Sequence, residues 1–314
     1  MDNPTSAGNK RRTDRITEHD QRLRPFLKWA GGKRQLVSTI REFVPQQYNI
    51  YFEPFVGAGA VLFNLQPHDA LINDANEELI NCYRVVRDEP SKLIQHARRH
   101  RNTKSYFYRL RSLDRTPQFE TTSPVERAAR IIFLNKTCFN GLFRVNSHGH
   151  FNVPYCKYLN PRIVDEMAIN AISRYFNTAN IQMTNDDFEE ALSGAAEGDF
   201  VYLDPPYDPV SNTSSFTGYN LPGFDRKEQK RLKSVCDDLT RRGCYLLMSN
   251  SATEFIRSLY SNTRRYTIVE VSAHRNINSV SSGRGKIKEL LIFNNYNIQK
   301  SPKAPPARNL RNLA

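Results

Sequence analysis

Short apolar runs recur along the chain and alternate with longer stretches in which apolar residues are spaced three or four positions apart. Continuous apolar runs bounded by turn residues are typical of strands buried in a parallel sheet. Such runs are found at residues 50–55, 70–72, 181–184, 200–203 and 245–248. Because a helical pattern follows each run, the chain is predicted to form a doubly wound, Rossmann-like α/β sheet that binds ligands at the carboxyl ends of its strands.

The clearest helical patterns cover residues 76–99 and 225–242, and the second stops at Gly243, a residue type that suits a helix C-terminus. Two later apolar runs, at residues 266–272 and 288–293, are separated by a polar loop. Two strands with this spacing predict an antiparallel pair at one edge of the sheet.

The alternation of strands and helices is interrupted over residues 98–174. Within this stretch Ser123 and Glu126 form a predicted capping box, which opens a helix that runs to about Phe139. Residues 142–158 then alternate between apolar and polar positions, a pattern that indicates a hairpin. We therefore expect residues 98–174 to be an inserted domain of helices and one β-hairpin, set into a catalytic domain formed by residues 25–97 and 175–296.

Residues 1–24 and 297–314 have no apolar periodicity and are rich in polar and basic residues, so we expect both to be disordered basic tails. No apolar run is long enough to cross a membrane or to serve as a secretory signal. The five cysteines form no Cys-x-x-Cys pair, which favours reduced thiols over disulfides or a zinc site. We expect a cytoplasmic, nucleoid-associated protein without a membrane partner and without a bound metal.

Charge is distributed unevenly along the chain. The total is +13, and residues 96–162 alone carry thirteen Lys and Arg against three acidic residues. A basic module in an otherwise slightly acidic protein is the pattern expected where phosphates of a nucleic acid are neutralised. Charge alone favours the simpler interpretation, a solvated helix face that happens to be basic.

A Gly-rich turn follows the first predicted strand, at residues 53–59. Gly57 and Gly59 allow the backbone to approach a ligand closely, and Glu53 and Phe55 flank the same turn. A tight strand-helix turn without a ligand explains this short motif as well. Asp74 follows the second strand, however, where an acidic side chain can accept hydrogen bonds from ribose hydroxyls.

The segment Phe26–Lys33 contains the only tryptophan of the chain, next to two glycines and a lysine. Lys33 is suited to pair with a ligand carboxylate, and Trp29 is suited to line a pocket near a sulfonium. The segment is not a P-loop, because the spacing of its glycines differs and Arg34 stands where Ser or Thr is required.

The predicted strand at residues 200–203 leads directly into Asp204-Pro205-Pro206-Tyr207. Two consecutive prolines cannot continue a ladder and fix the backbone in a rigid bend. Such a turn suits attack by an exocyclic amine, because the Asp204 carboxylate and the Pro205 carbonyl can accept its N–H groups while Tyr207 stacks on the ring. These four residues are the predicted catalytic motif.

A second acidic turn contains Asp187 and Phe188. Phe188 is suited to stack on an adenine, and Asp187 to accept from its amino group. An N-cap at Asp186 or Asp187 explains the same residues without a ligand, and both interpretations remain open.

Together these motifs resemble the DNA adenine methyltransferase (Dam) family, over residues 24–295. The resemblance rests on residues 26–33, 53–59, 140–144, 151–154 and 204–207. It implies a methyltransferase sheet, S-adenosylmethionine as cofactor, and cofactor contacts at Trp29, Lys33, Asp74 and Asp204. It also implies that Asn140, Leu142, Arg144 and Pro154 read GATC and that Lys28 contacts the first guanine. Arg is the residue type that reads guanine edges, and Leu and Pro suit a thymine methyl.

Two positions depart from the family pattern. Phe139 stands where a tyrosine is frequent, and Lys157 where an arginine is common, so Lys157 cannot make a bidentate contact. We expect site-specific methylation of adenine N6 in duplex DNA by base flipping and direct transfer. Residues 211–219 are predicted to close on the flipped base. For residues 276–288, a loop that holds phosphates and a plain solvent loop are equally good interpretations. The alternatives are an N4-cytosine methyltransferase and an inactive DNA-binding relative.

Overall fold

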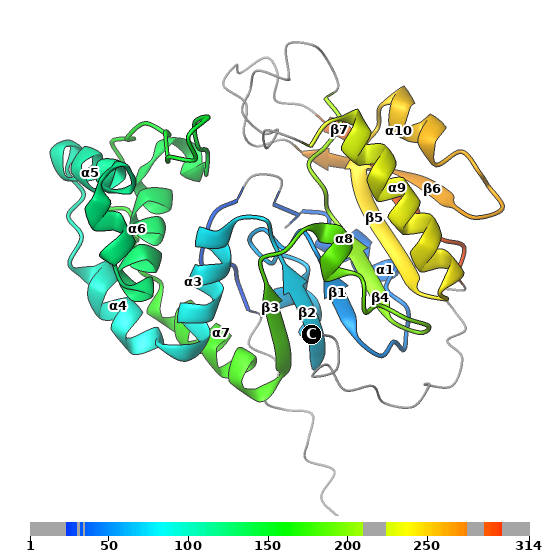
Figure 1. Ribbon diagram of the computed structural model, residues 1–314, viewed down its shortest axis with the longest axis horizontal. Helices are drawn as coiled ribbons and strands as arrows, with labels where there is room; N and C mark the ends of the chain where they lie inside the picture. Colours follow the sequence, from blue (N-terminus) through cyan, green and yellow to red (C-terminus); the bar gives the residue numbers. More distant parts are fainter. Residues whose placement is uncertain (1–22, 30–31, 34, 210–223, 275–285, 297–314) are drawn as a thin grey trace, which may run out of the picture.

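The computed structural model describes residues 23–29, 32–33, 35–209, 224–274 and 286–296. Its centre is a mixed sheet of seven strands with helices packed on both faces (Figure 1). The strands are β1 (Tyr51–Glu53), β2 (Asp69–Asn73), β3 (Asn180–Thr184), β4 (Phe200–Leu203), β5 (Tyr245–Ser251), β6 (Thr267–His274) and β7 (Lys286–Phe293). Each predicted strand is present, with its bounds shifted by a few residues at most.

The order of the sheet is β3-β2-β1-β4-β5-β7-β6. The pairs β2–β3, β1–β2, β1–β4 and β4–β5 are parallel, whereas β7 runs antiparallel to both β5 and β6. The predicted doubly wound sheet with antiparallel edge strands is confirmed. The chain leaves β1 toward β2 on one side and returns to β4 on the other, so the carboxyl ends of β1 and β4 form a topological switch point, the usual place for a ligand.

Two hydrophobic cores cover the two faces of the sheet. Along β4 the side chains alternate: Phe200 and Tyr202 belong to one core, and Val201 and Leu203 to the other. This alternation follows from the two-residue period of a strand, and burial on both faces explains the uninterrupted apolar sequence of β4.

The helices are divided between these two cores. The first core contains residues of α1 (Val37–Glu42), α2 (Leu62–Leu65), α3 (Glu77–Asp88), α4 (Pro90–Arg98), α6 (Pro124–Thr137) and α7 (Glu166–Thr178). The second contains residues of α8 (Phe188–Ala191), α9 (Arg226–Arg241) and α10 (Glu254–Leu259). In Figure 1, α8 and α9 lie in front of the sheet, and α3 to α7 form a lobe beside β3.

The predicted helix over residues 76–99 is two helices, and this is a correction. Asn76 caps α3 by accepting from the Leu79 N–H at 3.0 Å, and α3 ends at Asp88. Glu89 has φ −133° and ψ 45°, and α4 begins at Pro90. A proline has no N–H to donate and disfavours the helical conformation of the residue before it, so the chain turns at Glu89 and starts a new helix.

The interrupting stretch contains α5 (Lys104–Arg111), the 3-10 helices η1 (Ser112–Arg115) and η2 (Pro117–Thr121), α6, and η3 (Phe139–Gly141). The capping box is confirmed: Ser123 Oγ accepts from the Glu126 N–H, and the Glu126 carboxylate accepts from the Ser123 N–H. The predicted hairpin is less regular than expected. Only two isolated antiparallel bridges, Cys138–Tyr155 and Val145–Phe151, join its arms among the described residues.

A small core of its own lies inside this stretch, formed by Phe107 of α5, Phe133 and Leu134 of α6, and Phe151 and Val153 of the hairpin. The other side of α6 joins the core of the sheet. The predicted boundaries at residues 97–98 and 174–175 fall inside α4 and α7, because both helices run across them without interruption.

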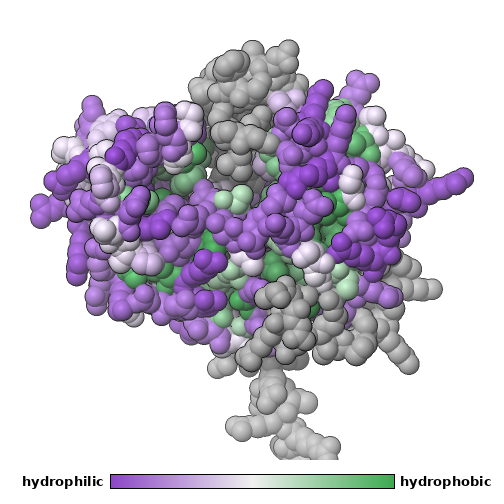
Figure 2. Space-filling view, viewed as in Figure 1, coloured by the Kyte–Doolittle hydropathy of each residue, from purple (hydrophilic) through white to green (hydrophobic). Residues whose placement is uncertain are grey.

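Part of the positive charge of residues 96–162 is neutralised by carboxylates of the protein itself. Arg98, Arg115, Arg127, Arg130 and Arg162 form ion pairs with nearby carboxylates. Three of these partners, Glu77, Glu78 and Glu166, lie outside residues 96–162, on α3 and α7. A charge count over residues 96–162 alone therefore does not include them. Hydrophilic side chains still dominate the outer surface of the lobe (Figure 2).

Among the helices that the structure describes, none has both the length and the apolar character that a membrane crossing needs. Several predicted segments lie outside the described residues. They are residues 1–22 and 297–314 of the tails, the loop at residues 211–219, and residues 276–285 of the later loop.

Candidate active site

Two acidic side chains lie where β1 and β2 end at the switch point. Glu53 is the last residue of β1 and is 2% exposed, and its Oε2 accepts from the Tyr51 hydroxyl at 2.8 Å. Asp74 directly follows β2, and its carboxylate accepts from the N–H groups of Gly57 and Asn76, each at 3.0 Å. Asp74 thus ties the Gly-rich turn after β1 to the end of β2.

The Gly-rich turn requires its glycines. Gly57 and Gly59 have φ of +50° and +71°, a region that other residues rarely adopt. A Cβ on Gly57 would lie 3.0 Å from Trp29 Cδ1, and one on Gly59 would lie 2.8 Å from the Tyr83 hydroxyl oxygen. The Tyr83 hydroxyl donates to the Gly57 carbonyl at 2.9 Å. The structure therefore brings Trp29 against Gly57, and Tyr83 against both glycines of the turn.

Three carboxyl groups near this turn are difficult to ionise. Burial raises the pKa of Glu53 to about 8, although the Tyr51 hydroxyl acts in the opposite direction. Burial also raises the pKa of Asp74 and of Asp204 to about 6 each. A concentration of poorly solvated acids favours a ligand that brings positive charge or hydrogen-bond donors.

The catalytic turn begins immediately after β4. The Lys33 ammonium lies 2.8 Å from Asp204 Oδ1, with side-chain exposures of 5% and 19%. The same ammonium lies 4.7 Å from the centre of the Tyr207 ring. Lys33 lowers the pKa of Asp204, but burial outweighs this effect. Lys33, Asp204 and Tyr207 therefore form one cluster.

Further residues hold the backbone of this turn. The buried Gln229 of α9 donates to the Pro206 carbonyl at 2.7 Å, and Asn250 of β5 donates to Gln229 Oε1 at 3.1 Å. The Tyr207 hydroxyl donates to Glu289 Oε2 of β7 at 2.7 Å. Two prolines fix the bend, and these contacts fix its orientation relative to the sheet.

The second acidic turn takes the N-cap form. Asp187 caps α8 by accepting from the Glu189 N–H at 2.9 Å, and it is also paired with Arg231 at 2.7 Å. The hydrogen bond from Arg231 is the main reason that the pKa of Asp187 is lowered. Phe188 is buried, with the Phe55 ring at 5.4 Å and the Arg231 guanidinium 4.1 Å from its centre. The rings of Phe55 and Phe188 are therefore in contact beside the Gly-rich turn, a pairing that the sequence did not predict.

The segment that carries Lys28 and Trp29 is attached to the interrupting stretch. Asn135 of α6 accepts from the Lys28 N–H at 2.9 Å and donates to the Lys28 carbonyl at 2.7 Å. Trp29 stacks on Phe143, with ring centres 5.0 Å apart. The predicted DNA contacts and the predicted cofactor contacts thus meet in one place.

The remaining predicted DNA contacts lie on η3 and the hairpin. Asn140 has a left-handed φ of 57°, and its N–H donates to the Tyr158 hydroxyl at 3.1 Å. Arg144 Nε donates to Asn152 Oδ1 at 2.7 Å, which orients an exposed guanidinium across the hairpin. The other four vary in exposure: Phe139 is 41% exposed, Pro154 and Lys157 are exposed, and Leu142 is half-buried.

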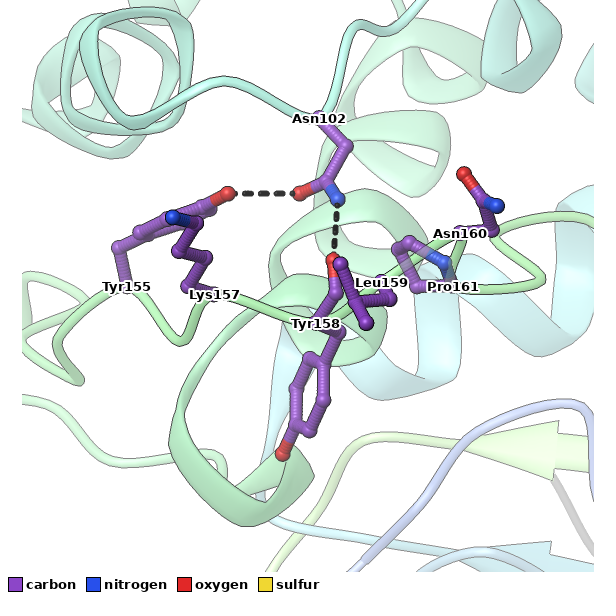
Figure 3. Close-up of a pocket in the computed structure, with 7 residues that line it drawn as sticks. All are labelled: Asn102, Tyr155, Lys157, Tyr158, Leu159, Asn160 and Pro161. Atoms are coloured by element: carbon purple, nitrogen blue, oxygen red, sulfur yellow. Dashed lines mark hydrogen bonds between the residues drawn. The ribbon is translucent and has the colours of Figure 1, made fainter.

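A pocket of about 540 Å³ opens at the end of the hairpin (Figure 3). Its lining residues are Asn102, Tyr155, Lys157, Tyr158, Leu159, Asn160 and Pro161. Asn102 joins two sides of the pocket, since it accepts from the Tyr155 hydroxyl and donates to the Tyr158 carbonyl, each at 3.1 Å (Figure 3). Of the residues predicted from sequence, only Lys157 lines it.

Sequence reasoning missed four residues that touch the site: Tyr83, Asn135, Gln229 and Glu289. Three are buried or half-buried polar side chains on elements that otherwise present apolar faces. A charged residue inside the strand Lys286–Phe293 was a usable signal, because an acid in a predicted strand needs a partner. Its partner depends on the order of the strands, which the sequence pattern does not specify.

The sheet order, the Gly-rich turn after β1 and the acidic turn after β4 together define an α/β methyltransferase. The model of the D12 class N6 adenine-specific DNA methyltransferase family matches residues 29–277. The chain belongs to this family and is an adenine-specific DNA methyltransferase.

Two relatives illustrate the similarity. The type II methyltransferase M1.LlaDCHI of Lactococcus lactis subsp. cremoris is 47% identical over 274 residues, which cover 87% of this chain and 95% of the relative. The DNA adenine methylase of Escherichia coli (strain K12) is 31% identical over 274 residues, covering 86% of this chain and 95% of that protein.

Proposed function

We propose that the protein transfers a methyl group from S-adenosylmethionine to N6 of adenine in duplex DNA, within GATC, by base flipping and direct transfer. The observation that carries the proposal is the cluster of Lys33, Asp204 and Tyr207 at the switch point, beside the Gly-rich turn. The cluster lies at the carboxyl ends of β1 and β4, which is where a sheet of this topology binds its ligand.

The residues present fit such a cofactor. A Cβ on Gly57 would press on Trp29 and one on Gly59 on Tyr83, so only glycines keep the turn after β1 in this tight shape beside Asp74. Glu53 and Asp74 offer acceptors for ammonium and hydroxyl groups, and we assign Trp29 to the side of the sulfonium. Phe55 and Phe188 provide aromatic surface for an adenine, with Asp187 at its edge. When bound, S-adenosylmethionine supplies an electrophilic methyl group.

The catalytic turn prepares the amine for attack. The Asp204 carboxylate and the Pro205 carbonyl accept the two N–H groups, which directs the nitrogen lone pair out of the base plane. Tyr207 stacks on the base and faces the positive charge that develops on the amine. Asp204 must be ionised to accept, so activity should fall as the pH decreases through about 6.

An adenine inside a duplex must leave the helix to reach this turn. We propose that residues 99–165, between α4 and α7, bind the duplex during this step. Arg144 is oriented to read a guanine, and Leu142 and Pro154 suit a thymine methyl. We assign Phe139 to fill the space left by the flipped base and Asn140 to read GATC. We assign Lys28 to the first guanine and Lys157 to a phosphate.

The test is a methylation assay with labelled S-adenosylmethionine and matched duplexes that contain or lack GATC. We expect label only on the GATC duplex, recovered as N6-methyl-2′-deoxyadenosine after digestion. Asp204→Ala should reduce turnover at least about a thousandfold, because it removes an acceptor aimed at the reacting amine. Asp88→Ala, at an exposed position at the end of α3, is the control. Equal label on both duplexes contradicts the GATC assignment, and an active Asp204→Ala enzyme contradicts the mechanism.

A further inference from the structure

We propose that Glu289 is the positioning residue of the catalytic turn: from β7 it holds the Tyr207 ring by its hydroxyl and adds negative charge beside Asp204. The inference rests on the proposed function, since it gives Tyr207 the role of stacking on the target base. It extends the catalytic unit from Asp204–Tyr207 to an acid that is 82 residues further along the chain.

Glu289 is well placed to act as a fixed anchor. It lies in the middle strand of three at this edge of the sheet, paired with Ser251 of β5 on one side and Val271 of β6 on the other. Strand pairing on both sides restricts the backbone, and the side chain is half-buried. The Tyr207 hydroxyl donates to Glu289 Oε2 at 2.7 Å, the short distance expected when the acceptor is a carboxylate.

This contact determines the orientation of the ring. The two prolines before Tyr207 fix the backbone, but they leave its χ1 and χ2 angles free. The Glu289 hydrogen bond fixes the far end of the ring, and the Lys33 ammonium lies 4.7 Å from the ring centre. A ring that is fixed at its hydroxyl end is pre-organised for stacking and needs less ordering when a base arrives.

The charge of Glu289 has a second effect. Burial is the largest cause of the raised pKa of both Tyr207 and Asp204, and the charge of Glu289 raises both further. The other groups that act on Asp204 or lie beside it are Lys33, Glu53, Tyr202 and Tyr207. Removing the charge at Glu289 while keeping the hydrogen bond should therefore lower the pKa of Asp204.

The experiment compares Glu289→Gln, Glu289→Ala, Tyr207→Phe and the double variant Glu289→Ala/Tyr207→Phe. Glu289→Ala and Tyr207→Phe should each lower kcat about tenfold, which corresponds to the loss of one hydrogen bond to a charged group. The double variant should lose no more than the larger single loss, because both changes remove the same contact. Glu289→Gln keeps an acceptor and should retain most of kcat above pH 8, with its acidic limb moved to lower pH.

A second readout does not depend on turnover. A duplex with 2-aminopurine at the target position becomes fluorescent when the base leaves the helix, and stacking on Tyr207 quenches it. At saturation, verified by anisotropy, the Glu289→Ala complex should be brighter than the wild-type complex. Glu270→Gln is the control: Glu270 lies on the adjacent strand β6 and pairs with Lys288 at 2.7 Å, outside the catalytic turn.

Three results would overturn the inference: additive losses in the double variant, an unchanged acidic limb in Glu289→Gln, or equal fluorescence in Glu289→Ala and wild type. If Glu289→Ala fails to fold, Glu289→Gln and Tyr207→Phe still decide between the outcomes. A wild-type protein that methylates no duplex would instead contradict the proposed function, so the two failures are distinguishable.

Discussion

Replacing Glu53 by Gln should make the stability of the protein depend less on pH. Burial raises the pKa of Glu53 from its ordinary 4.5 to about 8. The folded protein therefore binds a proton at this site between those two values, while the unfolded chain has already released it. A raised pKa of this kind stabilises the folded state fully below pH 4.5, and the stabilisation is lost as the pH rises toward 8.

The magnitude follows from the linkage between proton binding and folding. Each pH unit between 4.5 and 8 removes about 1.4 kcal/mol of unfolding free energy, so the loss at pH 7 is about 3 kcal/mol. The glutamine variant has no such loss. It does replace one acceptor oxygen by an amide NH₂, and Glu53 accepts from both the Tyr51 hydroxyl and the Leu62 N–H. One disrupted contact should destabilise the variant by about 1–3 kcal/mol at every pH.

The assay is urea unfolding of both proteins at pH 5, 6, 7 and 8 and constant ionic strength. The variant should be the less stable protein at pH 5, and the difference should shift in its favour by about 1.4 kcal/mol per pH unit. Asp74 and Asp204 also titrate in this range, but both proteins contain them, so their direct contributions cancel in the difference.

Glu254→Gln serves as the control, because Glu254 is exposed in the first turn of α10, and its difference from wild type should not vary with pH. A difference for Glu53→Gln that is equally flat would mean that the folded protein keeps Glu53 ionised at neutral pH. The account of the site as a cluster of poorly solvated acids would then be wrong.

Two glycines provide further predictions. Gly59→Ala should lower the free energy of unfolding by about 1–3 kcal/mol and weaken cofactor binding, because φ is +71° and the new Cβ would lie 2.8 Å from the Tyr83 hydroxyl. Scanning calorimetry measures the first effect and titration calorimetry with the cofactor the second. Gly141→Ala places a Cβ 2.5 Å from Lys28 Cδ, so it should reduce affinity for specific duplex about tenfold, measured by anisotropy. Gly149→Ala is its control, since φ is +77° with open space around the Cβ, and equal losses in both would contradict a role for Lys28.

Much of the fold was predictable because burial on both faces forces continuous apolar runs, which mark β1, β2, β4 and β5 in the sequence. The motifs at residues 53–59 and 204–207 were predictable for a related reason. Both directly follow a strand, and the ends of neighbouring parallel strands lie at the same edge of a sheet. The sequence therefore predicted that Asp74 and Asp204 belong to one site without specifying a distance.

What the sequence pattern did not specify depends on contacts between distant segments. The meeting of Tyr207 with Glu289 requires β7 to lie between β5 and β6, and a strand pattern carries no information about that order. The charge of the basic stretch was also a partial guide, because Arg127 pairs with Glu77 and Glu78 on α3 rather than with a phosphate. The break between α3 and α4 was different: Pro90 was a usable signal, and the long helical period outweighed it.

The segment around Lys28 connects the proposed DNA-binding residues to the catalytic turn. Lys28 is hydrogen-bonded through its backbone to Asn135 of α6, and Trp29 stacks on Phe143. Four residues further along, Lys33 pairs with Asp204. A displacement of α6 or of the hairpin must therefore move the same short segment that contacts the catalytic turn. For this reason a substitution at Gly141, whose Cβ would press on Lys28, should affect DNA binding first and turnover second, whereas Gly149→Ala at the tip of the hairpin should affect neither.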